Sequence, residues 1–177
     1  MSRAKAFAFA VLLTATGCAG SRLVPEIVDA PGMRTLPAVG ERNVDGDTAW
    51  FTLTDGSREK VRFIGVDTPE STTQHEPFGK EAAGYTASIL TVGRGVDLEI
   101  DLDERDRYGR LLAYVWISPP ATGDAAEARA KMLNAMLVEQ GYAMVLTIPP
   151  NIAYVDLFVA LQLEARNAAR GLWAVGS

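Results

Sequence analysis

The sequence predicts an α+β domain, mainly β, in which a closed five-stranded barrel packs against three α-helices. Stretches that alternate apolar and polar residues are typical of half-buried strands, and they fall into an early group of three and a central pair. Segments with the three-and-four spacing of amphipathic helices follow each group, and a third such segment ends the chain. Strands and helices in this order fit a Greek-key barrel of the OB type.

Three strands are expected in the first half of the domain, at residues 36–43, 44–54 and 60–66. The second of them alternates apolar residues with threonines and Trp50, which is the period-two pattern of a half-buried strand. The Asp-Gly pair at residues 55–56 predicts a tight hairpin turn into the third strand. Because Trp50 lies on a strand pattern, we expect it to pack at the core or its rim and not to stack on a base.

Two acidic residues, Asp45 and Asp47, stand at the start of the second expected strand. They have the same parity as Ala49 and Phe51, so their side chains are expected to point toward the core. A carboxylate in that position is partly desolvated and needs a partner or a cation.

The rest of the domain is expected to alternate helices with strands. An acidic run at residues 101–106 lacks the spacing of an EF-hand loop and is expected to be a charged turn. In chain order, the remaining elements are expected to be a helix at 78–92, strands at 96–102 and 110–117, a helix at 125–140, a short strand at 142–146 and a helix at 154–169.

Length and composition fit one ordinary globular domain. The chain has 177 residues, of which 48% are hydrophobic and 22% charged, so a disordered tail, a collagen-like repeat and a large multidomain protein are excluded. Its 17 basic and 22 acidic residues give a formal net charge of -5. Bulk charge alone therefore disfavours a nucleic-acid partner, although a chain of this size can carry a small cationic site on an acidic surface.

The N-terminus has the pattern of an export signal. Arg3 and Lys5 precede an apolar run at residues 6–13 that is too short to span a bilayer, and small residues follow it. The residues before Cys18 resemble a bacterial lipobox, in which the chain is cut before the cysteine and a lipid is attached to its sulfur. We therefore expect a lipoprotein-type signal peptide at residues 1–17 and lipidation at Cys18; a plain secretion signal is the alternative.

Residues 18–35 are expected to form a tether between the lipid anchor and a domain at residues 36–177, because they contain prolines and show no clear period. The protein is then exported and held on a bacterial membrane, facing the periplasm or the cell exterior; secretion without an anchor is the alternative. Removing residues 1–17 leaves 15 basic and 22 acidic residues, which is a net charge of -7. We expect a monomer, because no exposed apolar stripe is left over.

Three short segments concentrate charged residues at the ends of expected strands. Asp47 and Asp67 supply hard oxygen ligands of the kind that Ca²⁺ takes. Glu70 follows a proline that fixes the turn, and its position suits a general base that holds a water molecule. The segments are residues 44–48, 61–70 and 106–114, and they contain the motifs Asp-Gly-Asp-Thr, Asp-Thr-Pro-Glu and Tyr-Gly-Arg-Leu-Leu-Ala-Tyr.

Two arginines complete the pattern. Arg62 and Arg110 each offer a planar fork of donors that suits two phosphate oxygens. Together with the carboxylates, these arginines are the groups expected for metal-assisted attack of water on a phosphodiester. Taken singly, each segment has an ordinary alternative, namely a turn, a capped loop or an arginine paired with a surface carboxylate. The chemical interpretation is favoured because all three segments occur in one small domain.

The three segments together resemble those of the staphylococcal nuclease (thermonuclease) family. The resemblance covers about residues 36–173 and includes Lys-Met-Leu-Asn at 131–134, Gln-Gly-Tyr-Ala at 140–143 and Gly-Leu-Trp at 171–173. It implies an OB-fold, dependence on Ca²⁺, and endonucleolytic cleavage of DNA or RNA, with single strands favoured, to leave 3′-phosphates.

The resemblance also implies roles for the metal and for the attacking water. Asp47 and Asp67 match the calcium-binding aspartates, and Thr68 matches the residue that lends its backbone carbonyl. Glu70 matches the general base.

For the substrate, the resemblance makes Arg62 and Arg110 the phosphate-binding arginines of the catalytic centre. Tyr108 matches a tyrosine next to the active arginine, and with its neighbour Arg107 it is expected to contact the substrate.

The chain departs from the family pattern at residues 145–151. There the best-known family member has two tyrosines beside the bound nucleotide, whereas this chain has aliphatic residues and prolines, so base stacking is expected to be missing or to come from elsewhere. That member is also strongly basic, so we expect weaker affinity and a different salt dependence here. The alternative function is a catalytically weak nucleic-acid-binding or scaffold module of the same fold, which would be marked by loss of the acidic and arginine positions; all five are present.

Overall fold

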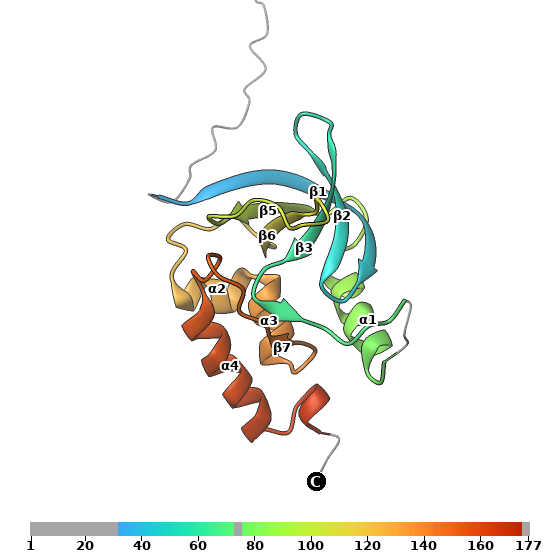
Figure 1. Cartoon of the computed structure of the whole chain (residues 1–177), viewed down its shortest axis with the longest axis vertical. Coiled ribbons are helices and arrows are strands. Elements are labelled where there is room, and N and C mark those ends of the chain that lie inside the picture. Colours follow the sequence, from blue (N-terminus) through green and yellow to red (C-terminus); the bar gives the residue numbers. More distant parts are fainter. Residues whose placement is uncertain (1–31, 73–75, 175–177) are drawn as a thin grey trace, which may run out of the picture.

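The structure is a computed structural model that describes residues 32–72 and 76–174 (Figure 1). The signal peptide expected at residues 1–17, the lipidation site expected at Cys18 and most of the tether expected at 18–35 lie outside the described residues. Within the described ranges, no helix has the length and apolar character needed to cross a membrane.

Five strands close into a barrel in the order β1-β2-β3-β6-β5, with β5 pairing back to β1. Every neighbouring pair is antiparallel except β3 and β6, which run parallel. This topology confirms the expected five-stranded Greek-key barrel of the OB type. The strands are β1 (Arg34–Asp45), β2 (Thr48–Leu53), β3 (Arg58–Phe63), β5 (Gly95–Ile100) and β6 (Leu111–Trp116).

The helices pack around this barrel. In Figure 1, α2, α3 and α4 gather on one side of the barrel, and α1 lies near its other end. Contacts between α3 and α4, and between α3 and β6, tie this helical layer together and to the barrel. The helices are α1 (Gly79–Ile89), α2 (Ala125–Lys131), α3 (Leu133–Glu139) and α4 (Val155–Asn167), followed by the short 3-10 helix η1 (Gly171–Trp173).

The helix expected at residues 125–140 is interrupted at Met132, so the expected number of three α-helices is wrong. Met132 has extended backbone angles (φ -100°, ψ 123°), is fully buried and pairs with Trp116 at the end of β6. Ile117 continues this pairing by donating its backbone N–H to the Lys131 carbonyl at 2.9 Å. The helix breaks because its backbone bonds to the barrel at this point.

The buried side chain of Asn134 fixes the start of α3 against the barrel. Its Oδ1 accepts a hydrogen bond from the Val115 backbone N–H at 2.9 Å, and its Nδ2 donates to the Ile64 carbonyl at 2.8 Å. These backbone groups belong to β6 and to the turn that follows β3. One amide therefore links the two parallel strands to the helical layer.

The first two strands differ from the expectation in where they meet. β1 continues to Asp45, and β2 starts at Thr48, its partner across the sheet. The strand expected at residues 44–54 therefore contains a tight turn formed by Gly46 and Asp47. The alternating pattern runs through this turn because both aspartates face the interior, one on each side of the glycine.

A second, two-stranded sheet lies outside the barrel. β4 (Val66–Asp67) pairs antiparallel with β7 (Met144–Val145), which confirms the short strand expected at 142–146. Gly65 makes the bend before β4: its φ is 78°, and a Cβ there would lie 2.6 Å from a ring atom of Phe158 in α4. The small sheet carries the end of β4 away from the barrel and toward the helices.

One continuous core fills the barrel and extends between the helices. Burying each large apolar side chain contributes about 1.5–3 kcal/mol relative to leaving it in water. The core fixes the strand ends on which the charged segments lie. Its largest fully buried side chains include Phe51, Val61, Phe63, Leu98, Tyr114, Trp116, Met132, Leu133, Leu137, Phe158 and Leu161.

The outer face of α4 carries an exposed apolar stripe. Val159 and Leu163, one helical turn apart, are 53% and 59% exposed, and Ile152 before the helix is 48% exposed. The reason given above for expecting a monomer, the absence of such a stripe, is therefore wrong. The oligomeric state itself stays a prediction.

A buried carboxyl group, Glu99, lies between the barrel and α4. It accepts hydrogen bonds from Trp116 Nε1 at 2.7 Å and from the Tyr154 hydroxyl at 3.0 Å. Burial raises the pKa of Glu99, and the two hydrogen bonds offset only part of that effect. Folding therefore favours the protonated form of this side chain.

We predict a pH-dependent stability difference between the wild type and Glu99→Gln. Because the folded-state pKa of Glu99 is raised above its ordinary value of 4.5, its contribution to stability is fully present below pH 4.5 and is lost as pH rises through the folded-state pKa. Urea denaturation at a series of pH values should show the wild type losing stability relative to Glu99→Gln over this window. If the stability of the wild type minus that of Glu99→Gln stayed constant or rose with pH, the burial of this carboxyl group would be contradicted.

Candidate functional site

The turn between β1 and β2 buries two carboxylates. Asp45 is 8% exposed and Asp47 is 6% exposed, which confirms the expectation that both point inward. Gly46 between them approaches the segment after β4 closely, since a Cβ at this position would lie 2.7 Å from Thr68 Oγ1. Glycine therefore allows the turn to pack directly against Thr68.

Asp47 is held by this contact. Its Oδ2 accepts hydrogen bonds from the Thr68 backbone N–H at 2.9 Å and from the Thr68 hydroxyl at 3.1 Å. Its Oδ1 accepts from the Thr48 hydroxyl at 3.0 Å. The carboxylate is thus fixed between the start of β2 and the chain that leaves β4.

The Arg62 guanidinium bridges two carboxylates from different segments. Its Nη1 lies 2.9 Å from Asp47 Oδ2, and its Nη2 lies 2.8 Å from Asp67 Oδ1. Nη1 also donates to the Val66 carbonyl at 2.8 Å. Only 13% of the Arg62 side chain and 9% of the Asp47 side chain are exposed, so water screens this ion pair little, whereas the Asp67 side chain is 49% exposed.

Negative charge remains in excess around this arginine. Burial raises the pKa of Asp67, Arg62 opposes the increase, and the negative charges of Asp47 and Glu76 add to it. Burial and a hydrogen bond with the Glu70 carboxyl likewise raise the pKa of Asp45. Both pKa values are raised mainly by burial, and an additional cation nearby would favour the ionised form of the two carboxyl groups.

Glu70 lies beside Asp45 on the loop after β4. Its Oε1 accepts hydrogen bonds from the Thr72 hydroxyl at 2.5 Å and from the Thr72 backbone N–H at 3.3 Å. Its own backbone N–H donates to Glu76 Oε2 at 2.9 Å, and Ser71 donates to Asp45 Oδ1 at 2.7 Å. Local hydrogen bonds therefore hold the half-buried Glu70 carboxylate at the edge of the cluster.

Asp106 orients Arg110. Its Oδ2 accepts from Arg110 Nε at 2.6 Å, and its Oδ1 accepts from the backbone N–H groups of Tyr108 and Arg110, both at 2.9 Å. Burial raises the pKa of Asp106, but these hydrogen bonds outweigh burial and leave it below its ordinary value. Sequence reasoning placed Asp106 in a charged turn and at the start of the third charged segment but gave it no role of its own; an aspartate four residues before the arginine is the signal that could have identified that role.

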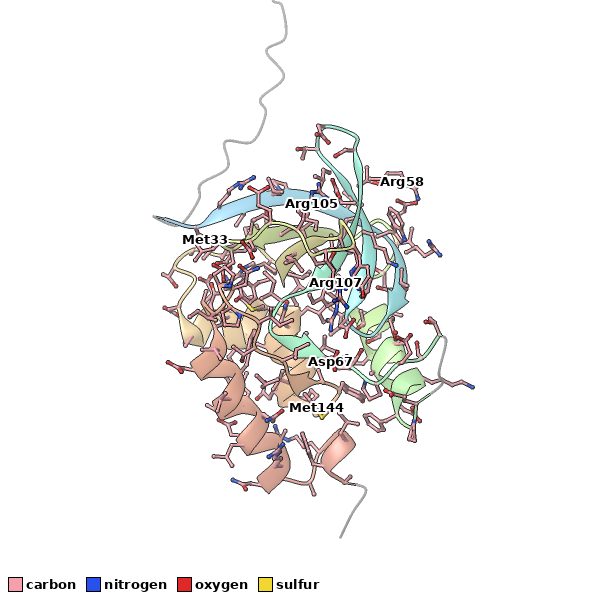
Figure 2. The ribbon with its side chains drawn as sticks, viewed as in Figure 1. Met33, Arg58, Asp67, Arg105, Arg107 and Met144 are labelled. Atoms are coloured by element: carbon pink, nitrogen blue, oxygen red, sulfur yellow. The ribbon has the colours of Figure 1, made fainter. Side chains whose placement is uncertain are left out.

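Arg107 and Tyr108 project beside Arg110. Arg107 donates to the Tyr108 hydroxyl at 2.6 Å, and the guanidinium carbons of Arg107 and Arg110 lie 4.7 and 5.6 Å from the centre of its ring. The Tyr108 ring is 68% exposed. Figure 2 shows Arg107 and Asp67 near the middle of the view, between the barrel strands and the helical layer.

Two adjoining cavities collect the residues singled out by the sequence. A cavity of about 210 Å³ is lined by the two predicted metal ligands, Thr68, the predicted base and both predicted phosphate-binding arginines. A larger cavity of about 500 Å³ shares Arg62 and Arg110 with it. Arg107 and Tyr108 line this second cavity on one side, and Leu146, Ile148, Pro149 and Pro150 also line it.

The first cavity suits a hard cation. Within residues 32–72 and 76–174, no group of three or more His, Cys, Asp or Glu residues is arranged to hold a metal ion, so the candidate donors are fewer: two carboxylates and the Thr68 carbonyl. All are oxygens, which Ca²⁺ prefers. A single guanidinium contacts both Asp47 and Asp67, so the two carboxylates converge on one positive charge, and these residues fit such an ion.

Comparison with known proteins finds a matching family and several relatives of this chain. Residues 60–175 match the family of staphylococcal nuclease homologues. The chain is 40% identical to the thermonuclease of Staphylococcus intermedius and 37% identical to that of Staphylococcus hyicus, each over 136 residues that cover 75% of this chain and 73% of the relative. It is 32% identical to endonuclease YncB of Bacillus subtilis over 139 residues, which cover 76% of this chain and 60% of that protein.

Proposed function

The chain belongs to the staphylococcal nuclease family and is a nuclease that hydrolyses phosphodiester bonds, and from this premise we propose that it is a calcium-dependent endonuclease that leaves 3′-phosphates. The observation that carries the proposal is the convergence of Asp47, Asp67 and Arg62 in one cavity that Glu70 and Arg110 also line. Two carboxylates, a base and two arginines are the groups that phosphodiester hydrolysis requires.

In the proposed reaction, Glu70 accepts a proton from the attacking water. The water oxygen forms a bond to phosphorus, the bond from phosphorus to the 5′-oxygen breaks, and the leaving oxygen takes a proton from solvent. The products are a 3′-phosphate and a 5′-hydroxyl group. The hydrogen bonds from Thr72 hold the Glu70 carboxylate in place before the substrate arrives.

Arg62 and Arg110 donate hydrogen bonds to the phosphate oxygens and offset the charge that develops on them. Asp106 orients Arg110 in advance, whereas Arg62 is held by the Val66 carbonyl and the two carboxylates. A donor that is already oriented costs little reorganisation in the transition state. To reach the phosphate, Arg62 must give up part of its contact with the carboxylates.

Asp47, Asp67 and the Thr68 backbone carbonyl are the residues that would hold a Ca²⁺ ion. When bound, the ion supplies positive charge that polarises a phosphate oxygen. The raised pKa of Asp67 supports this assignment, because it reflects a desolvated and negatively charged environment that lacks a sufficient counter-charge.

The second cavity supports a preference for single-stranded nucleic acid. Its apolar lining at Leu146, Ile148 and Pro149 can cover the face of a base, and a base in a single strand is free to leave its stack. Tyr108 supplies an exposed aromatic ring on the same cavity. Arg107, beside this ring, is suited to a phosphate of the same strand.

The alternative of a catalytically weak binding or scaffold module is less well supported. Such a module would have lost charged groups that hydrolysis needs and binding does not. Here both aspartates, the glutamate and both arginines are retained and line one cavity.

We predict that Glu70→Gln and Arg110→Ala each lower the rate of DNA hydrolysis by about two orders of magnitude or more, because each removes one preorganised group. The measurement is the initial rate on single-stranded DNA in calcium buffer, and a chelator should abolish wild-type activity. Glu164→Gln, a change of the same kind on the exposed face of α4, is the control and should retain the parental rate. If either Glu70→Gln or Arg110→Ala retained the parental rate, this mechanism would be contradicted.

We further propose that the protein is exported and anchored to a bacterial membrane by a lipid on Cys18. The pattern of residues 1–18 supports this proposal. In a bacterial host, the wild type should sediment with membranes and be released by detergent, whereas Cys18→Ser should lose the detergent-released membrane fraction. If both proteins were equally soluble without detergent, the plain secretion signal would be the better interpretation.

A further inference from the structure

A row of three side chains crosses the outer face of the barrel beside the catalytic cavity. Arg42 on β1 is the registered partner of Trp50 on β2, and Trp50 is the registered partner of Lys60 on β3. Registered partners in antiparallel strands point to the same face. Ala49 and Phe51, the neighbours of Trp50 along β2, are buried in the core, so the row faces outward.

The row is continuous with the catalytic cavity. Lys60 lines the cavity of about 210 Å³ together with Arg62, which lies two residues further along β3 on the same face. Two residues along a strand span about 6.8 Å. A strand of nucleic acid whose phosphate lies at Arg62 would therefore meet Lys60 next, and then Trp50 and Arg42 across the sheet.

The row offers positive charge on an acidic protein. Arg42 is exposed and Lys60 is half-buried, and in the described part of the chain neither forms an ion pair with a carboxylate. By contrast, Arg58, which lies on β3 like Lys60, and Arg105 in the loop before β6 are paired with Glu41 and Glu59. On a chain with a formal net charge of -5, the row therefore combines two cations that have no ion-pair partner with an aromatic ring.

Trp50 is held in position for stacking. The Arg58 guanidinium carbon lies 5.4 Å from the centre of the Trp50 ring, and two hydrogen bonds to Glu41 fix that guanidinium. Figure 2 shows Arg58 on the projecting hairpin formed by β2 and β3. Bases stack both on aromatic rings and on arginine planes, so Trp50 and Arg58 together form a preorganised stacking surface.

We propose that Arg42, Trp50 and Lys60, named here the sheet row, bind the single-stranded segment of the substrate that extends beyond the catalytic cavity. Arg42 and Lys60 contact its phosphates, and Trp50 with Arg58 stacks on its bases. This assignment rests on the proposed function at the neighbouring cavity. It gives Trp50 a role in substrate binding that its strand pattern did not predict, and it supplies aromatic stacking that residues 145–151 lack.

Steady-state kinetics with two substrate lengths test the sheet row. The long substrate is single-stranded DNA of about 20 nucleotides, which exceeds the 4–16 nucleotides that one barrel of this type contacts, and the short one is a trinucleotide. In calcium buffer, Arg42→Gln and Trp50→Leu should each raise KM for the long substrate about five-fold or more with kcat unchanged. Neither variant should change the kinetics on the trinucleotide.

Salt dependence and matched controls separate the role of each residue. Arg42→Gln should reduce the slope of log KM against log salt by about 0.7, which corresponds to one lost phosphate contact, whereas Trp50→Leu should leave the slope unchanged. Trp50→Phe should restore most of the affinity, because a phenyl ring also stacks. The control is Arg166→Gln, because Arg166 also lies over a tryptophan ring, that of Trp173, and the change also removes one positive charge. This variant should behave as the wild type.

The outcomes distinguish this inference from the function on which it rests. If the wild type cleaves the long substrate and both variants retain its KM within two-fold and its salt slope, the sheet row does not bind substrate. An equal loss on the trinucleotide would also overturn the inference, since it would indicate damage to the cavity. If the wild type does not cleave single-stranded DNA in calcium, the proposed function itself fails.

Discussion

The site depends on one interaction, the bridge that Arg62 forms between Asp47 and Asp67 at 2.9 and 2.8 Å. It joins the β1–β2 turn to β4, two segments that the chain separates by a complete hairpin. Asp47 is buried beside the half-exposed Asp67, and without a cation between them the two carboxylates would repel each other. The glycine between Asp45 and Asp47 lets the turn approach Thr68 closely enough for this bridge to form.

The local arrangement of its basic residues, and not its total charge, allows this acidic chain to bind a polyanion. Away from the cavities, Arg34, Arg58 and Arg129 are paired with carboxylates, and Arg129 contacts both Glu139 and Glu164. Around the cavities, by contrast, Arg107 and Lys60 form no ion pair with a described residue, and Arg110 is oriented by Asp106. Long-range attraction of nucleic acid is therefore weak, and capture depends on contacts within the cavities and along the sheet row.

Sequence reasoning identified the barrel because its strands alternate with period two and each ends at a turn signal. It missed the break at Met132, because the apolar spacing of a helix does not reveal that a buried backbone also bonds to β6. The charged motifs identified the residues that line the first cavity. Two residues of these motifs, Asp45 and Asp106, were found without their contacts, since Asp106 acts through its position in a turn and Asp45 through a contact with Glu70 across the fold.

The most direct measurement is a crystal structure of the Glu70→Gln protein grown with Ca²⁺ and a single-stranded oligonucleotide. We expect a cation about 2.3–2.6 Å from oxygens of Asp47, Asp67 and Thr68, and the Arg62 guanidinium hydrogen-bonded to a phosphate. That result would mean that the two carboxylates form a cation site that Arg62 occupies only in part. A cation bound elsewhere, with Arg62 still bridging both carboxylates while DNA is bound, would contradict it.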